Sequence, residues 1–179
     1  MSVKSLLPIL CLAGGMVPLC GQQTEAGIQG SVLFPQQALR QATDGHVGFE
    51  LGVHAAIDLQ GGNEIRPRLD YTRIDGGSFS GSSLTGTTSV QGVGLGADYL
   101  RYLEDTRRGL YGAAGLELFW WNTKYRFSGS DRLTTPMVMI GVGHRFNANV
   151  AAEFDIDFGQ FRSSVGTASS IKGGIFYRF

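Results

Sequence analysis

Apolar and polar residues alternate along most of the chain after residue 22. The clearest run is 46–59, where seven apolar residues take every second position from Val47 to Leu59. A period of two places alternate side chains on opposite faces of a β-strand, so this run predicts a strand. The same split recurs in five further segments: 92–99, 115–121, 137–146, 150–159 and 171–179.

Two less regular segments bring the predicted count to eight strands. Residues 65–73 alternate but contain Pro67, which costs the sheet a hydrogen-bond donor, and residues 26–34 alternate weakly. No segment after residue 22 shows a capped apolar pattern of helical period, so the connections are expected to be loops. They alternate in length, with short turns at 60–63, 104–108 and 147–149 and mostly longer loops at 35–45, 76–87, 127–134 and 162–166. This pattern predicts an antiparallel up-and-down barrel, with both chain ends on the side of the short turns.

The two faces of these strands differ in chemistry. The polar face combines many glycines with charges of both signs, which suits a crowded interior where opposite charges pair. We therefore predict a transmembrane barrel with its apolar face outward, and prefer it to a soluble barrel with an apolar interior. The expected lumenal network consists of Glu50, His54, Asp58, Arg66, Arg68, Asp70, Asp98, Glu117, Arg145, Glu153, Asp155, Asp157, Lys172 and Arg178.

Aromatic residues gather near the ends of the predicted strands. Amphipathic rings favour the membrane–water interface, so these positions predict aromatic girdles. The expected girdle residues are Tyr99, Tyr102, Trp120, Phe146, Tyr177 and Phe179.

The composition and the N-terminal segment indicate where the protein is located. The 15 basic and 15 acidic residues balance, which gives no basic patch for nucleic acid, and only three residues are lysine. Ser5–Leu19 is apolar and uncharged after Lys4, which predicts a signal peptide over residues 1–21 and a barrel domain over 22–179. Both cysteines fall in the leader; lipidation of Cys20 is the alternative, although the bulky Leu19 precedes it.

The C-terminal segment 172–179 resembles the terminal assembly signal of outer-membrane β-barrel proteins. Its matching residues are Lys172, Gly174, Tyr177 and Phe179. With the eight predicted strands, the chain resembles the small barrels of the OmpA, OmpX and Opa type. The resemblance implies a place in the outer membrane of a Gram-negative-type bacterium. It also implies contact with outer-membrane lipids and lipopolysaccharide, and biogenesis by the barrel assembly machinery.

The lumen of an eight-stranded barrel is just wide enough for side chains to fill, so we expect no wide pore. A structural or surface-interaction role is the first hypothesis, with no cofactor, metal or catalytic residue assigned. A lipid-modifying enzyme of the lipid A deacylase or acyltransferase type is the second. It needs a histidine near a serine, for which His46 beside the 76–87 loop is the candidate, since His54 shares the charged face and His144 precedes Arg145.

Two further alternatives stay open. A narrow conduit for small solutes would need a lateral opening or an apolar lumen, whereas the predicted lumen is charged. Glu153, Asp155 and Asp157 share one face and offer oxygen ligands to a divalent ion, but pairing with lumenal basic residues is favoured. The external ligand or partner is not specified by any motif.

Overall fold

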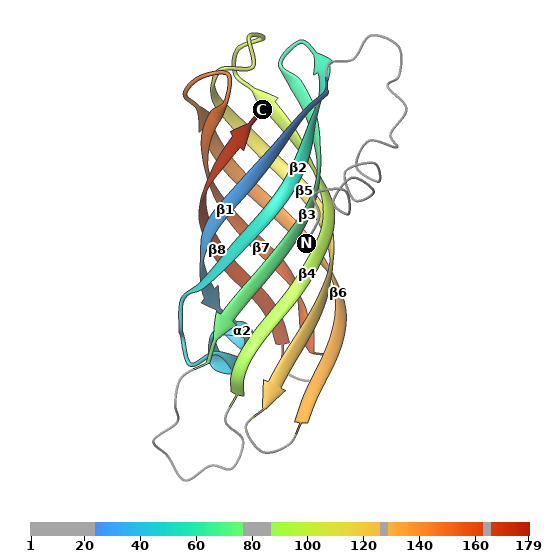
Figure 1. Ribbon diagram of the computed structural model, residues 1–179, viewed down its shortest axis with the longest axis vertical. Helices are drawn as coiled ribbons and strands as arrows, with labels where there is room; N and C mark the ends of the chain where they lie inside the picture. The colour runs from blue at the N-terminus through green and yellow to red at the C-terminus, as the bar shows by residue number, and fades with distance from the viewer. Residues whose placement is uncertain (1–23, 77–86, 126–128, 163–165) are drawn as a thin grey trace, which may run out of the picture.

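The chain forms a closed barrel of eight antiparallel strands in sequential order. The computed structural model describes residues 24–76, 87–125, 129–162 and 166–179. Within them the strands are β1 (Thr24–Gln36), β2 (Gly48–Gln60), β3 (Asn63–Asp75), β4 (Thr87–Tyr102), β5 (Gly109–Tyr125), β6 (Gly129–Arg145), β7 (Val150–Arg162) and β8 (Gly166–Arg178) (Figure 1). Pairing of β1 with β8 closes the ring, so all eight strands have two neighbours. The predicted up-and-down barrel is confirmed.

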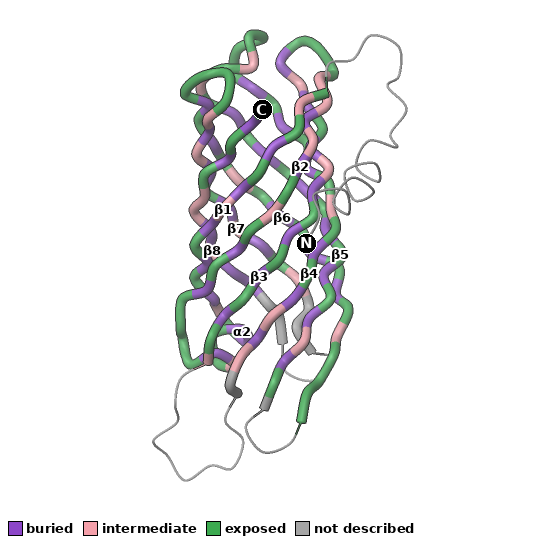
Figure 2. The backbone as a smooth tube through the Cα atoms, viewed as in Figure 1, coloured by how far each residue is buried: buried purple, intermediate pink, exposed green. Residues whose placement is uncertain are grey.

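Burial alternates along every strand, and the apolar face is the outer one (Figure 2). In β2, Phe49, Leu51 and Val53 are exposed whereas Glu50 and His54 are buried. The same inversion holds in β7, where Phe154 is exposed between two buried acids. The prediction that the apolar side chains point away from the lumen is therefore confirmed.

The two ends of the barrel differ. One end holds the short turns at 61–62, 103–108 and 146–149, together with the start of β1 and the end of β8; we call it the turn end. The other holds the connection from β1 to β2 and is called the helix end (Figure 1). The long loop predicted at 127–134 is wrong, because β5 and β6 continue to Tyr125 and from Gly129 and pair through polar residues such as Asn122 with Arg132.

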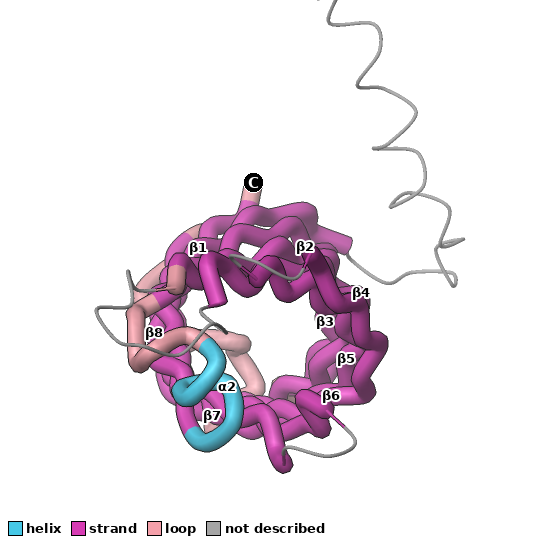
Figure 3. The backbone as a smooth tube through the Cα atoms, turned by 90° about the horizontal axis from the view of Figure 1, so that it is seen from below, coloured by secondary structure: helices cyan, strands magenta, loops and turns pink. Residues whose placement is uncertain are grey.

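The segment predicted as a loop at 35–45 contains a short helix, α2 (Gln37–Ala42), which corrects the sequence prediction. Seen from the helix end, α2 lies across part of the barrel opening, and it packs on β8 and β1 (Figure 3). Six residues are too few to show a helical period or to be stable alone, so burial of Ala38 and Leu39 in the barrel must hold the helix. The loop predicted at 76–87 lies mostly outside the described residues.

The apolar residues around α2 form a cluster inside the barrel at the helix end. It contains Leu33, Ala38, Leu39, Ile74, Val90, Phe119, Trp121 and Met137. Since Leu39 is 1% exposed, the helix fills this part of the lumen. The interior is thus apolar around α2, and a second buried apolar cluster, which includes Leu100, Tyr102, Tyr111 and Phe176, lies among the charged groups nearer the turn end.

Candidate functional site

The charged lumen is the most elaborate arrangement of polar side chains in the described structure. All predicted members of the network point inward and are buried except Asp58, whose side chain is 22% exposed at the turn end. They come from seven strands, β2 to β8, because each strand turns its polar face inward. The structure also divides them into groups that the sequence does not reveal.

Arg66 on β3 forms the centre of the first group. Its guanidinium lies 2.9 Å from Asp98 on β4 and 2.6 Å from Glu153 on β7. The guanidinium carbon also lies 4.2 Å from the centroid of the Phe176 ring, close enough for a cation–π contact. Tyr111 donates a hydrogen bond of 2.8 Å to Glu153, so four strands (β3, β4, β7 and β5) are joined across the lumen.

Arg68, two positions along the same face of β3, contacts three acids, of which Asp70 and Glu117 are not part of the first group. Its nitrogens lie 3.1 Å from Asp70, 3.2 Å from Asp98 and 3.1 Å from Glu117. Gln29 on β1 donates a hydrogen bond of 2.6 Å to Asp70. Asp98 therefore belongs to both groups and links them.

Lys172 on β8 forms the third group, nearer the helix end. Its Nζ lies 3.0 Å from Glu50 and 3.1 Å from Asp157. Thr72 donates to Glu50 and Ser170 donates to Asp157, at 2.8 and 2.9 Å. A residue that the sequence marks as part of an assembly signal is thus also a lumenal cation with two carboxylate partners.

A fourth group lies at the turn end; Arg145 and Arg178 belong to the predicted network, whereas its central acid, Glu64, was not predicted. Glu64 is fully buried, and Arg178 donates hydrogen bonds of 2.8 and 2.5 Å to its two oxygens. Arg107 and Arg145 lie 3.8 and 4.0 Å from it, and Glu25 lies 3.3 Å from Arg145. Glu64 has the parity of Arg66 and would have been found had the predicted strand begun before residue 65.

Several lumen-facing glycines lie directly beneath a large side chain of the neighbouring strand. A Cβ at Gly94 would overlap Glu117 Oε1, and one at Gly141 would overlap Asp155 Oδ1. Glycine at these positions leaves room for carboxylates that lie along the wall. The polar face is therefore rich in glycine because its charged side chains are packed.

The three acids that could hold a divalent ion, Glu153, Asp155 and Asp157, do not share one partner. Glu153 contacts Arg66 and Asp157 contacts Lys172, while Asp155 Oδ1 is buried without a hydrogen-bond partner. Among the described residues, no three His, Cys, Asp or Glu side chains are placed to hold a metal ion.

The histidines are spread over different environments. His54 lies in the lumen with its ring 5.7 Å from that of Phe176, and neither of its nitrogens has a hydrogen-bond partner. His46 is exposed at the helix end, and the serines of the loop proposed beside it lie outside the described residues. His144 is exposed near the turn end, with its ring 4.8 Å from that of Phe146.

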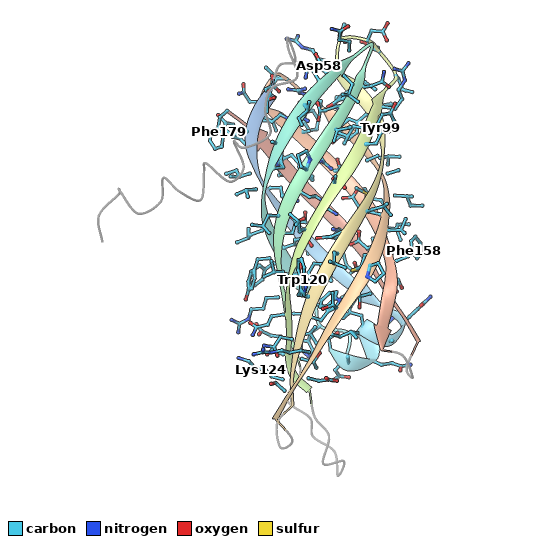
Figure 4. All side chains as sticks on the ribbon, turned by 90° about the vertical axis from the view of Figure 1, so that its right-hand side faces the viewer. Asp58, Tyr99, Trp120, Lys124, Phe158 and Phe179 are labelled. Atoms are coloured by element: carbon cyan, nitrogen blue, oxygen red, sulfur yellow. The ribbon has the colours of Figure 1, made fainter. Side chains whose placement is uncertain are left out.

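The predicted girdle aromatics do not all face outward. Trp120 lies toward the helix end, and Tyr99 and Phe179 toward the turn end (Figure 4). Phe146 and Tyr177 are also exposed, and the Tyr177 and Phe179 rings meet edge to face at 5.4 Å. The prediction that Tyr102 belongs to the girdle is wrong. Its side chain is 1% exposed inside the barrel, with its ring 4.9 Å from that of Tyr111. It points inward because it lies an even number of residues from the inward-facing Asp98 and Leu100 on the same strand.

In the described stretches, no helix has the length and apolar character needed to cross a bilayer. No protein-family model and no curated protein sequence matches the chain.

Solved structures share the fold at low sequence identity. Neisserial surface protein A is 17% identical with a TM-score of 0.54, over 89% of this chain and 99% of its own. Ail, the attachment invasion locus protein of Yersinia pestis, is 15% identical with a TM-score of 0.55 and the same coverage. The N-terminal β-barrel domain of Pseudomonas aeruginosa OprF is 12% identical with a TM-score of 0.56, over 88% of this chain and all of that domain. The chain therefore has the fold of small eight-stranded outer-membrane β-barrels.

Proposed function

We propose that this chain is an integral outer-membrane protein of a Gram-negative-type bacterium with a structural or surface-interaction role and no wide pore. The observation that carries the proposal is the inversion of the barrel, with a charged interior and an apolar exterior. Exposed aliphatic and aromatic side chains encircle it on every strand from β1 to β8. A soluble monomer rarely exposes so continuous an apolar surface, whereas lipid requires one.

The orientation follows from the connections. In membrane barrels the short turns face the periplasm, so the turn end is assigned to the periplasm and the helix end to the outside. In this assignment residues 1–21 are a cleaved leader, and both chain ends of the mature barrel are periplasmic. Outer-membrane lipids and lipopolysaccharide surround the barrel, and the barrel assembly machinery reads the segment from Lys172 to Phe179.

The filled lumen supports the absence of a wide pore. Four ion-pair groups cross it, and α2 with its apolar cluster occupies the helix end. Planar-bilayer recordings of the purified barrel should show no stable conductance on the nanosiemens scale. Large, persistent conductance steps would contradict this part of the proposal.

Cysteine labelling in intact cells tests location and topology together. Both native cysteines lie in the proposed leader, so one new cysteine would be the only thiol of the mature chain. His46→Cys, at the exposed helix end, should react with a membrane-impermeant maleimide in whole cells. Thr106→Cys, exposed in a turn at the other end, is the matched control and should react only after the outer membrane is opened. Recovery of the protein in the soluble periplasm, or equal labelling of both variants, would refute the proposal.

A further inference from the structure

The seam between β6 and β7, the line along which these two strands pair, ends early at the helix end. Its last paired residues are Met137 and Gly159. Beyond this point β6 stays paired with β5 as far as Gly129, and β7 stays paired with β8 as far as Arg162. The hairpins β5–β6 and β7–β8 therefore continue past the point where they are joined to each other, and β5 and β6 project farther (Figure 1).

Pro136, the residue next to Met137 on β6, explains where the seam ends. Phe146, on the same outward face of β6, donates its backbone N–H to the Val150 carbonyl on β7, so outward residues of this strand turn their N–H toward β7. Pro136 has no N–H to donate. It pairs with Leu118 on β5, two residues before Trp120, so the seam ends within the apolar belt and not above it.

A seam that ends at this depth is unfavourable in lipid, because acyl chains offer no hydrogen bonds to backbone groups. Pro67 interrupts the seam between β2 and β3 as well, but pairing resumes beyond it at Ile57 with Ile65. The side chains behind that break, Arg66 and Arg68, are charged. The end of the β6–β7 seam differs in both respects, since pairing does not resume in the described strands and the interior behind it is apolar.

The interior at the end of the seam is one side of the apolar cluster around α2. Met137 belongs to this cluster and lies across the seam, since a Cβ at Gly159 would meet its Cγ at 2.7 Å. Leu133, farther along β6 with the same inward parity, packs against the cluster but is only partly buried. Val90 and Phe119, on strands away from the seam, are fully buried. The cluster is therefore incompletely covered where the seam ends.

The helix that fills the cluster is weakly held. Of its six residues, only Ala38 and Leu39 are buried. The chain enters it through Gln37 with φ of 47°, a left-handed conformation that a residue with a Cβ adopts at a cost. The side chain of Gln36, at the N-cap, donates to the Phe34 carbonyl instead of capping the helix. Helix α2 can therefore shift at little cost when another apolar group enters the cluster.

We propose that the apolar cluster around α2 binds one acyl chain of an outer-leaflet lipid, which enters between β6 and β7 past Pro136 and Leu133 and lies against Met137. The occupant is an acyl chain because the seam ends inside the apolar belt, where lipid chains are the surrounding medium. Lys172 and its partner Glu50 lie below the cluster, so the chain binds there and does not pass through the lumen. The inference rests on the proposed membrane placement and adds a lipid-binding site to it.

Trp121 is a built-in reporter for this site, because it belongs to the cluster and is 3% exposed. The change Trp120→Phe makes it the only tryptophan of the chain. The full barrel is reconstituted in bilayers of phosphatidylcholine whose acyl chains carry bromine, which quenches tryptophan fluorescence on contact. A reference variant combines Trp120→Phe and Trp121→Phe with Tyr102→Trp, a position equally buried in the second apolar cluster, where β4 and β5 are paired. The loss of emission should be about two-fold larger for Trp121 than for the reference, because an enclosed ligand contacts it directly.

Two changes in the Trp120→Phe background close the entry by different means. Pro136→Val restores a backbone N–H that faces β7, and Leu133→Asn places an amide in the path of the acyl chain. Each should reduce the quenching of Trp121 to the level of the reference. Leu103→Asn, at an exposed leucine in a turn at the other end, is the matched control and should leave the quenching unchanged. Heat-modifiable gel mobility verifies that every variant is a folded barrel.

Trp120 tests the membrane placement separately. It is exposed on the apolar belt, so in the Trp121→Phe variant it should be quenched by the same brominated lipid. Absence of that quenching would refute the membrane placement and the inference together. Quenching of Trp120 without excess quenching of Trp121 over the reference would overturn the acyl-chain site and leave the placement intact. Excess quenching that survives in both Pro136→Val and Leu133→Asn would also overturn the inference, because the chain would then not enter at this seam.

Discussion

Replacing Arg66 by methionine should sharply destabilise the barrel. Methionine keeps much of the side-chain volume but removes the charge between Asp98 and Glu153. Arg66 donates four hydrogen bonds to these carboxylates, and its side chain is 1% exposed. The change therefore leaves two carboxylates inside the barrel without their main cation.

The magnitude follows from what each acid retains. Glu153 keeps the Tyr111 hydroxyl at 2.8 Å, and Asp98 keeps Arg68 at 3.2 Å, so neither is left without a donor. Removing one partner of a buried ion pair costs about 3–5 kcal/mol, and the remaining donors argue against a larger loss. Neutralising one stranded acid as well, by Glu153→Gln, should restore part of that loss, so the double variant should be less destabilised than the sum of the single variants.

Urea unfolding in lipid vesicles, followed by tryptophan fluorescence and heat-modifiable gel mobility, measures the free energy of unfolding. Arg73→Met is the matched control, because Arg73 and Asp75 form an exposed pair, and its unfolding midpoint should match that of the wild type. A loss below about 1 kcal/mol for Arg66→Met would show that the lumenal pairs do not hold the barrel together. Strict additivity in the double variant would refute the coupling.

Three further changes test other parts of the structure in the same unfolding assay. Gly94→Ala should destabilise the barrel because its Cβ would overlap Glu117, whereas Gly112→Ala, with open space around the new Cβ, should be tolerated; equal effects would contradict the packed lumen. Leu39→Ala should cost about 2–5 kcal/mol by opening a cavity under α2, and a neutral result would mean that the helix is not seated in the apolar cluster. Ile140→Lys, on the outer face of β6, should cost about 2–4 kcal/mol in bilayers if that position is near the membrane midplane, and a stabilised barrel would contradict lipid contact.

The sequence by itself determined the strands and their two faces. Alternation is a local property, since each side chain points opposite to its chain neighbour whatever the strand pairs with. Alternation places Arg66 and Glu153 on the polar faces of their strands and Phe49 on an apolar face, and the glycines and the charges of both signs on the polar face then assign it to the lumen. The same alternation, continued along β3 and β4, places Glu64 and Tyr102 on the lumenal face, where both are buried.

Only the tertiary structure decided which lumenal charges meet. Arg66 and Glu153 are 87 residues apart, and their contact depends on closure of the ring and on the stagger of the strands, neither of which a local period encodes. Closure also placed Arg107, a turn residue, beside Glu64. The sequence could not predict the position of α2 either. Its six residues are too few to show a helical period, and the apolar cluster that they pack against comes from strands distant in sequence.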